Sequence, residues 1–188
     1  MGNFYIEGME YQENVLPRIH RRLGLETSVI FSGSSDDVMV KTTSKERIQT
    51  YVNRDDVQVF KLLTCSKFHK KYCRGLTSLL RQICPDIIFV HGGQFMNLHE
   101  VVRYKRLNPN VKIYLDQHAD FYNTPIRYWP LKKLITSCIN KYFYGYWIRK
   151  TSRCAEKVWG VTPWRVQYLQ EVYKVPKEKT DLLVMGGD

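Results

Sequence analysis

The strongest constraint on the fold is a regular alternation of short apolar runs with longer amphipathic segments. Four runs have the length and composition of buried strands: residues 26–31, 57–63, 86–91 and 111–115. Two weaker runs follow, at residues 157–161 and 181–185. Strands that alternate with helices indicate βαβ units and a mostly parallel sheet covered on both faces. We therefore expect an α/β protein with a Rossmann-like, doubly wound sheet. Its central strands should bury Val29, Ile88, Val90, Ile113 and Leu115.

The segments between these runs carry apolar residues at helical spacing. They predict helices over residues 68–83, 97–107, 131–153 and 162–173. An earlier helix ends at Gly24 and contains Pro17, which either kinks it or lies in its first turn. Residues 33–56 are polar and are interpreted as a surface excursion between strands. Only six residues precede the loop at Glu7, so the first strand of the fold is expected to be short or missing.

The charge of the chain restricts its partners. Its 188 residues suit one domain and carry a formal net charge of +11. A basic balance of this size indicates a polyanionic partner, which is nucleic acid, anionic lipid or a phosphorylated substrate. Charge alone leaves all three open. No recognised nucleic-acid-binding motif is present, so nucleic acid is not the expected partner.

The cysteines and histidines give no sign of a metal site or a disulfide framework. The five cysteines form no C-x-x-C pair, and the five histidines are scattered without metal-ligand spacing. No stretch is apolar for the roughly 18 residues that a membrane span requires, and the start of the chain lacks a signal peptide. We expect a cytoplasmic protein without a metal. This expectation includes peripheral contact with the inner face of a membrane.

Candidate binding residues follow the predicted strands. In an open parallel sheet, ligands bind at the carboxyl ends of the strands, where loops lead into helices. Glycines let a ligand approach the backbone, and helix N-termini offer N–H groups to phosphate or sugar. The substrate-binding candidates at such positions are Gly8, His91, Gly92, Gly93 and Thr162. A tight strand-to-helix turn would explain any single glycine equally well.

His118 is the sharpest catalytic candidate. It follows a predicted strand and is flanked by Asp116 and Asp120. An imidazole there can accept or donate a proton near neutral pH, and a neighbouring carboxylate can orient it. We take His118 and Asp120 as the catalytic pair. The alternative is a histidine whose hydrogen bonds are satisfied within a turn.

Residues 127–157 combine basic and aromatic side chains on a predicted helix. Such a helix suits a membrane interface, where rings insert and lysines meet anionic headgroups. The candidate membrane contacts are Lys132, Lys133, Lys141, Phe143 and Trp147. The alternative is a long surface helix with solvated lysines.

In their order along the chain, these features resemble the N-terminal domain of family-4 retaining glycosyltransferases, which have the GT-B architecture. Residues 21–30, RRLGLETSVI, resemble the family's opening after a glycine loop and a helix. Residues 85–91, PDIIFVH, resemble its P-D-I-I-x-x-H strand, and His118 lies where many members place an active-site histidine. Residues 158–162 resemble the segment before the hinge, and residues 175–188, VPKEKTDLLVMGGD, resemble the passage to the second domain.

The resemblance implies transfer of a sugar from a nucleotide sugar to a glycan or lipid-linked acceptor, without a further cofactor. Gly8 would lie near the donor phosphates, and His118 would contact the transferred sugar or assist at the reacting centre. The closing loop departs from the family pattern, with Met185-Gly186 where Asn-Gly is usual.

The family's second domain holds most contacts to the sugar nucleotide, and no segment of residues 1–188 corresponds to it. The resemblance therefore implies that this chain is the acceptor-side domain, inactive in isolation and completed by a C-terminal domain or a separate donor-binding subunit. Two alternatives stay open. One is a non-catalytic module that docks on a catalytic subunit, and the other is a basic protein that binds nucleic acid.

Overall fold

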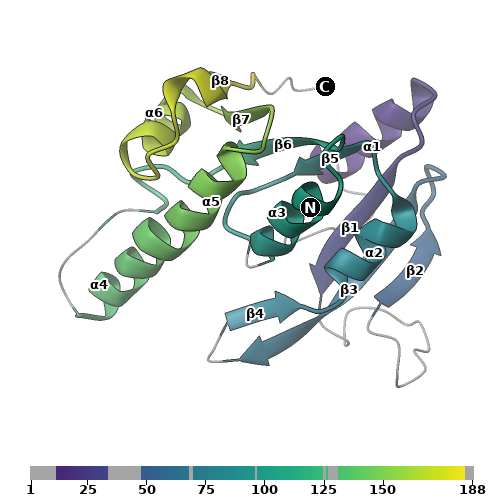
Figure 1. Cartoon of the computed structure of the whole chain (residues 1–188), viewed down its shortest axis with the longest axis horizontal. Helices are drawn as coiled ribbons and strands as arrows, with labels where there is room; N and C mark the ends of the chain where they lie inside the picture. Colours follow the sequence, from purple (N-terminus) through teal and green to yellow (C-terminus); the bar gives the residue numbers. More distant parts are fainter. Residues whose placement is uncertain are drawn as a thin grey trace. The chain divides into compact units, whose positions relative to one another are not determined.

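The computed structural model describes residues 12–33, 48–67, 70–95, 97–124, 126 and 131–184. The structure is mixed α/β and contains a parallel sheet, as the sequence predicts (Figure 1). Backbone contacts divide it into two compact units, Met1–Leu79 and Leu80–Asp188. Among the described helices, none has both the length and the apolar character needed to cross a bilayer.

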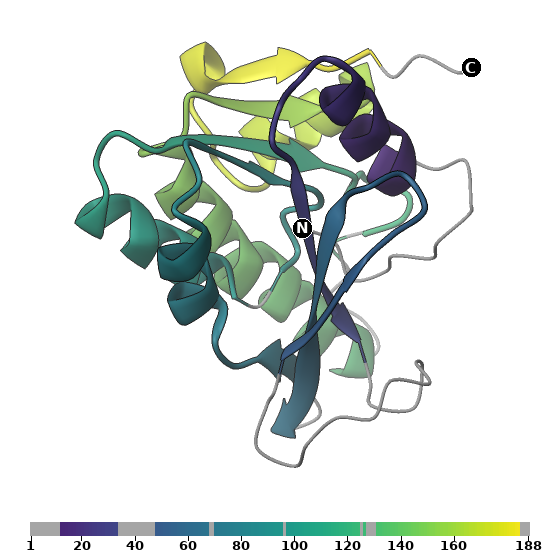
Figure 2. The same ribbon diagram turned by 90° about the vertical axis from the view of Figure 1, so that its right-hand side faces the viewer.

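The first unit is built around one long central strand. Its elements are α1 (Gln12–Arg22), β1 (Ser28–Gly33), β2 (Ile48–Val52), β3 (Gln58–Lys67) and β4 (Lys70–Cys73). Strand β3 pairs in parallel with β1 and antiparallel with β2 and β4. The turn that joins β2 to β3 can be followed in Figure 2. Phe31 and Val59 form a small core that Val29 and Tyr51 cover.

Two strands of this unit were not predicted. Part of the segment interpreted as a surface excursion forms β2, and the first half of the helix predicted over residues 68–83 forms β4. The helix there, α2, covers only Leu76–Ile83. Gly75 has a φ of +95°, which a continuous helix does not allow. Hydrogen bonds to β3 define both strands, and the local sequence has no apolar pattern that would predict them.

The second unit has a parallel sheet. It contains β5 (Ile87–Val90), β6 (Lys112–Gln117), β7 (Lys157–Gly160) and β8 (Thr180–Leu182). The described strands lie in chain order, and every neighbouring pair is parallel. All six predicted strands are confirmed within a few residues, but they belong to two sheets and not to one.

Helices connect the strands of the second unit. They are α3 (Leu98–Leu107), α4 (Leu131–Cys138), the π-helical segment η2 (Ile139–Tyr144), α5 (Gly145–Ser152), α6 (Pro163–Glu171) and the short η3 (Lys177–Lys179). Figures 1 and 2 show α4, η2 and α5 as one continuous helical rod, which confirms the long helix predicted there. Helix α5 packs against α3, and α6 packs against β7 and β8.

The core of the parallel sheet is the one predicted. Ile88, Val90, Ile113 and Leu115 are buried, as expected for strands covered by helices. Val29, predicted to be buried with them, is only half-buried and lies in the first unit. Because side chains alternate along a strand, Ile113, Leu115 and Gln117 share one face of β6, and Asp116 lies on the other.

Candidate functional site at the carboxyl edge of the parallel sheet

The register of two parallel strands brings His91 next to Asp116. Val90, the last residue of β5, lies opposite Leu115 of β6, so the following residues are also neighbours. The Nδ1 atom of His91 lies 2.7 Å from Oδ2 of Asp116, which is a short hydrogen bond. Asp116 is fully buried, and 17% of the His91 side chain is exposed.

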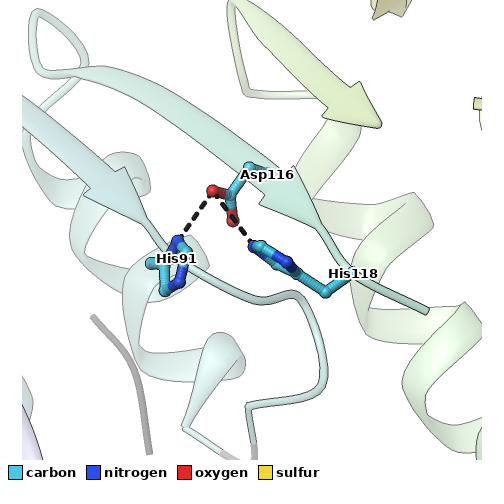
Figure 3. Close-up of side chains that lie close together, drawn as sticks. All are labelled: His91, Asp116 and His118. Atoms are coloured by element: carbon cyan, nitrogen blue, oxygen red, sulfur yellow. Dashed lines mark hydrogen bonds and ion pairs between the residues drawn. The ribbon is translucent and has the colours of Figure 1, made fainter. Parts of the chain in front are cut away.

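His118 approaches the same carboxylate oxygen from the other side (Figure 3). Its Nε2 atom lies 3.4 Å from Oδ2 of Asp116, and the two imidazole rings meet edge to face with centroids 4.5 Å apart. The His118 side chain is 36% exposed. One buried carboxylate therefore holds two imidazoles, of which His118 is the more open to solvent.

The electrostatics of Asp116 keep it ionised. Burial alone would raise the pKa of its carboxyl, but the contacts from His118 and His91 outweigh burial and hold the pKa well below its usual range. Through these contacts the buried carboxylate orients both imidazoles. The arrangement suits a histidine that must gain and lose a proton or donate a hydrogen bond to a ligand.

The loop after β5 is fixed by two consecutive residues of β6. The backbone N–H of Gly92 donates to Oδ1 of Asp116 at 2.7 Å, and that of Gly93 donates to Oε1 of Gln117 at 2.8 Å. Gly92 has a φ of +82°, a conformation that side chains disfavour. A Cβ on Gly93 would lie 2.8 Å from the Gln117 oxygen. Gly92 is therefore favoured by its backbone conformation, and Gly93 by the close approach of the loop to β6.

Two buried tyrosines support the loops around the site. The hydroxyl of Tyr173 accepts a hydrogen bond from Nε2 of Gln94 at 3.2 Å. The hydroxyl of Tyr168 donates to the carbonyl oxygen of Thr124 at 2.7 Å. Burial raises the pKa of Tyr173 to about 12 and raises the pKa of Tyr168 as well. Both hydroxyls therefore stay neutral and act as positioning groups.

Asp120, predicted as the catalytic partner of His118, makes other contacts. Its Oδ1 atom accepts from the backbone N–H groups of Tyr122 and Asn123, and its Oδ2 atom lies 3.4 Å from Nε of Arg165. Burial alone would raise the pKa of Asp120, but these backbone bonds and Arg165 lower it overall. Asp120 therefore shapes the loop that follows His118, and Asp116 is the carboxylate that contacts the imidazole.

The other predicted residues are distributed as follows. Thr162 is the N-cap of α6, and its hydroxyl accepts a long hydrogen bond from the backbone of Arg165 at 3.4 Å. It follows β7, at the same edge of the sheet as the histidines. Gly8 lies outside the described residues, so its predicted place in a cleft with His118 is not tested. Lys132 and Lys133 lie in the first turn of α4.

Of the predicted membrane contacts on the rod, Phe143 is exposed and Lys141 lies beside the ring of Tyr142. Trp147 is half-buried, and its ring lies 5.6 Å from that of His99.

Sequence reasoning missed the roles of Gln117, Gln94, Tyr168 and Tyr173. The available signal was the polar pair Asp116-Gln117 at the end of a predicted strand. Residues of a parallel strand are normally apolar, so a polar pair there indicates a specific role, and Gln117 is buried. The comparisons add no assignment: no protein-family model matches the sequence, and no curated protein matches it significantly.

Proposed function

We propose that this chain forms the acceptor-side part of a glycosyltransferase that uses a nucleotide sugar as donor. The observation that carries the proposal is the placement of His118 at the carboxyl edge of a parallel sheet, against the buried carboxylate of Asp116. Open α/β sheets bind their ligands at this edge. The order of the sequence motifs, which resembles the family-4 glycosyltransferases, supplies the reaction type.

In this proposal His118 contacts the sugar at the reacting centre, and Asp116 positions it. The exposed part of the imidazole donates a hydrogen bond to a hydroxyl or takes up a proton, while Asp116 stabilises the positive charge that results. His91, Gly92 and Gly93 line the neighbouring loop, and Thr162 marks the start of α6, where N–H groups face a ligand. The proposal requires no covalent nucleophile.

Binding of the acceptor tests the proposal directly. Residues 1–188 are titrated with a panel of glycans and polyprenyl-linked saccharides, and binding is followed by calorimetry. We expect saturable binding to one class of saccharide and about tenfold weaker binding by His118→Ala, since a hydrogen bond from the imidazole is lost. His20→Ala, in α1 and therefore in the other unit, is the matched control and should bind normally. Equal binding by His118→Ala, or no binding to any saccharide, would contradict the proposal.

A further inference from the structure

The side chains around Asp116 have the composition and spacing of a metal site. Nδ1 of His91, a carboxylate oxygen of Asp116 and Nε2 of His118 all lie within 4.8 Å of one another. We propose that these three residues bind a divalent transition-metal ion, with Zn²⁺ as the best fit. Imidazole nitrogen and carboxylate oxygen are the ligands that Zn²⁺ takes in proteins, together with thiolate. This inference does not rest on the proposed function, and it gives the same three side chains a different role.

The distances fit a tetrahedral ion after small side-chain shifts. Zinc binds nitrogen and oxygen at about 2.0–2.2 Å, so two ligands of a tetrahedral ion lie about 3.3 Å apart. The distance from Oδ2 of Asp116 to Nε2 of His118 is 3.4 Å, and that to Nδ1 of His91 is 2.7 Å. When the ion enters, two coordinate bonds replace the short hydrogen bond between His91 and Asp116. The His91 ring then moves away from Asp116 by less than about 1 Å.

His118 supplies an independent sign. Its Nε2 atom is buried, yet it makes no well-formed hydrogen bond to any part of the chain that the structure describes. The nitrogen lies 3.4 Å from Oδ2 of Asp116, a separation that suits shared coordination of an ion better than donation of a proton. A buried polar atom without a hydrogen bond costs free energy, and a coordinate bond to a cation would recover that free energy.

The carboxylate is already oriented for coordination. The N–H group of Gly92 donates to Oδ1 of Asp116, which leaves Oδ2 directed at the two imidazoles. Such an outer hydrogen bond fixes a metal ligand and raises the affinity of the site. Because the His118 side chain is partly exposed, water can fill the fourth position, as in zinc sites with an open coordination position.

Sequence reasoning predicted no metal site because the three residues lack a recognised ligand spacing. His91 lies 25 positions before Asp116, and only the parallel register of β5 and β6 brings them together. The prediction of no metal is therefore replaced by the proposal of this site.

The test is titration of metal-free protein with ZnCl₂ by calorimetry. We expect one site of micromolar affinity or tighter, weakened by about 100-fold or more in His118→Asn and Asp116→Asn, since loss of a ligand exceeds the loss of an outer partner. Circular dichroism of each metal-free variant checks its fold. His118→Asn replaces a partly exposed side chain and keeps the test valid if Asp116→Asn does not fold. His20→Ala is the control and should bind zinc as the unaltered chain does.

The free cysteines call for a second measurement. Cys84 and Cys138 are exposed and could bind zinc themselves. Replacing zinc by Co²⁺ separates the two kinds of site, because thiolate ligands add charge-transfer bands that nitrogen and oxygen ligands lack. Ligand-field bands without thiolate bands, lost in His118→Asn, support the proposal. Thiolate bands, unchanged affinity in both variants, or no saturation at millimolar metal would overturn it.

Discussion

At the residue scale, buried polar side chains hold the site together. Asp116 and Gln117 are adjacent in β6 and point to opposite faces of the sheet, so each fixes a different backbone amide of the same loop. Tyr173 continues this support through Gln94, and its phenol is buried against Tyr168 with ring centroids 5.1 Å apart. The geometry around His91 and His118 thus depends on buried polar side chains of the surrounding strand and loops.

The phenol of Tyr173 predicts a specific loss of stability at high pH. The pKa of Tyr173 is about 12 in the folded chain against 10.0 for a free tyrosine, so the folded state holds the proton more tightly. The protonated phenol therefore contributes its full stabilisation below pH 10, and this stabilisation is lost as the pH rises towards 12. The loss is about 2–3 kcal/mol by linkage. Tyr144 raises this pKa further, while hydrogen bonds with Gln94, Tyr168 and Gln117 lower it without cancelling the effect of burial.

Tyr173→Phe tests this prediction. At pH 8 the variant should be less stable by about 1 kcal/mol, because Gln94 loses a hydrogen-bond partner. Between pH 10 and 12 the difference should shrink or reverse, because phenylalanine has no proton to lose. Urea unfolding followed by circular dichroism at both pH values gives the comparison. Tyr122→Phe, at a side chain that is 83% exposed, is the control and should follow the unaltered chain. A constant difference at all pH values would refute the buried neutral phenol.

At the element scale, the helical rod of α4, η2 and α5 presents aromatic rings to solvent. Tyr142 is 63% exposed, Phe143 38% and Tyr146 45%. Lys141 lies over the ring of Tyr142, and Lys150 lies over those of Tyr146 and Trp147. Trp147 packs on His99, so Tyr142 and Phe143 are the better candidates for insertion into a lipid interface.

The rod predicts binding to anionic lipid. The chain should co-sediment with phosphatidylglycerol vesicles and not with phosphatidylcholine vesicles, and added salt should weaken the binding, because each basic residue near the surface contributes about 1 kcal/mol. Tyr142→Ser combined with Phe143→Ser should reduce binding several-fold. Trp164→Ser removes an aromatic ring that is 60% exposed on α6, which is not part of the rod, and is the control. Equal binding to both lipids would count against the prediction.

Elements with a local signal could be predicted from the sequence, and elements defined by distant pairing could not. Strands β5 and β6 are apolar runs between helical segments, and their predicted edge does carry His91 and His118. Strands β2 and β4 lack such a pattern, because pairing with β3 defines them. The sequence places acidic residues on both sides of His118, and Asp120 was named as the catalytic one. Only the folded loop distinguishes the two, because Asp116 lies 3.4 Å from the imidazole and Asp120 contacts Arg165.

At the scale of the whole molecule, the chain contains two α/β units, and the candidate site lies wholly in the second. Its parallel sheet, its two loops and the tyrosines that support them all belong to residues 80–188. We propose that the carboxyl edge of this sheet binds a saccharide through His118.

The most direct test is nuclear magnetic resonance of the histidine side chains in metal-free, ¹⁵N-labelled protein. The imidazole signals of His91 and His118, assigned with His→Asn variants, are followed while the saccharide that binds in calorimetry is added. The account predicts that both signals shift and saturate together, while those of His20 and His99, which lie on α1 and α3, stay in place. Saturation of binding with unmoved His91 and His118 signals would contradict it, because the saccharide would then occupy another surface.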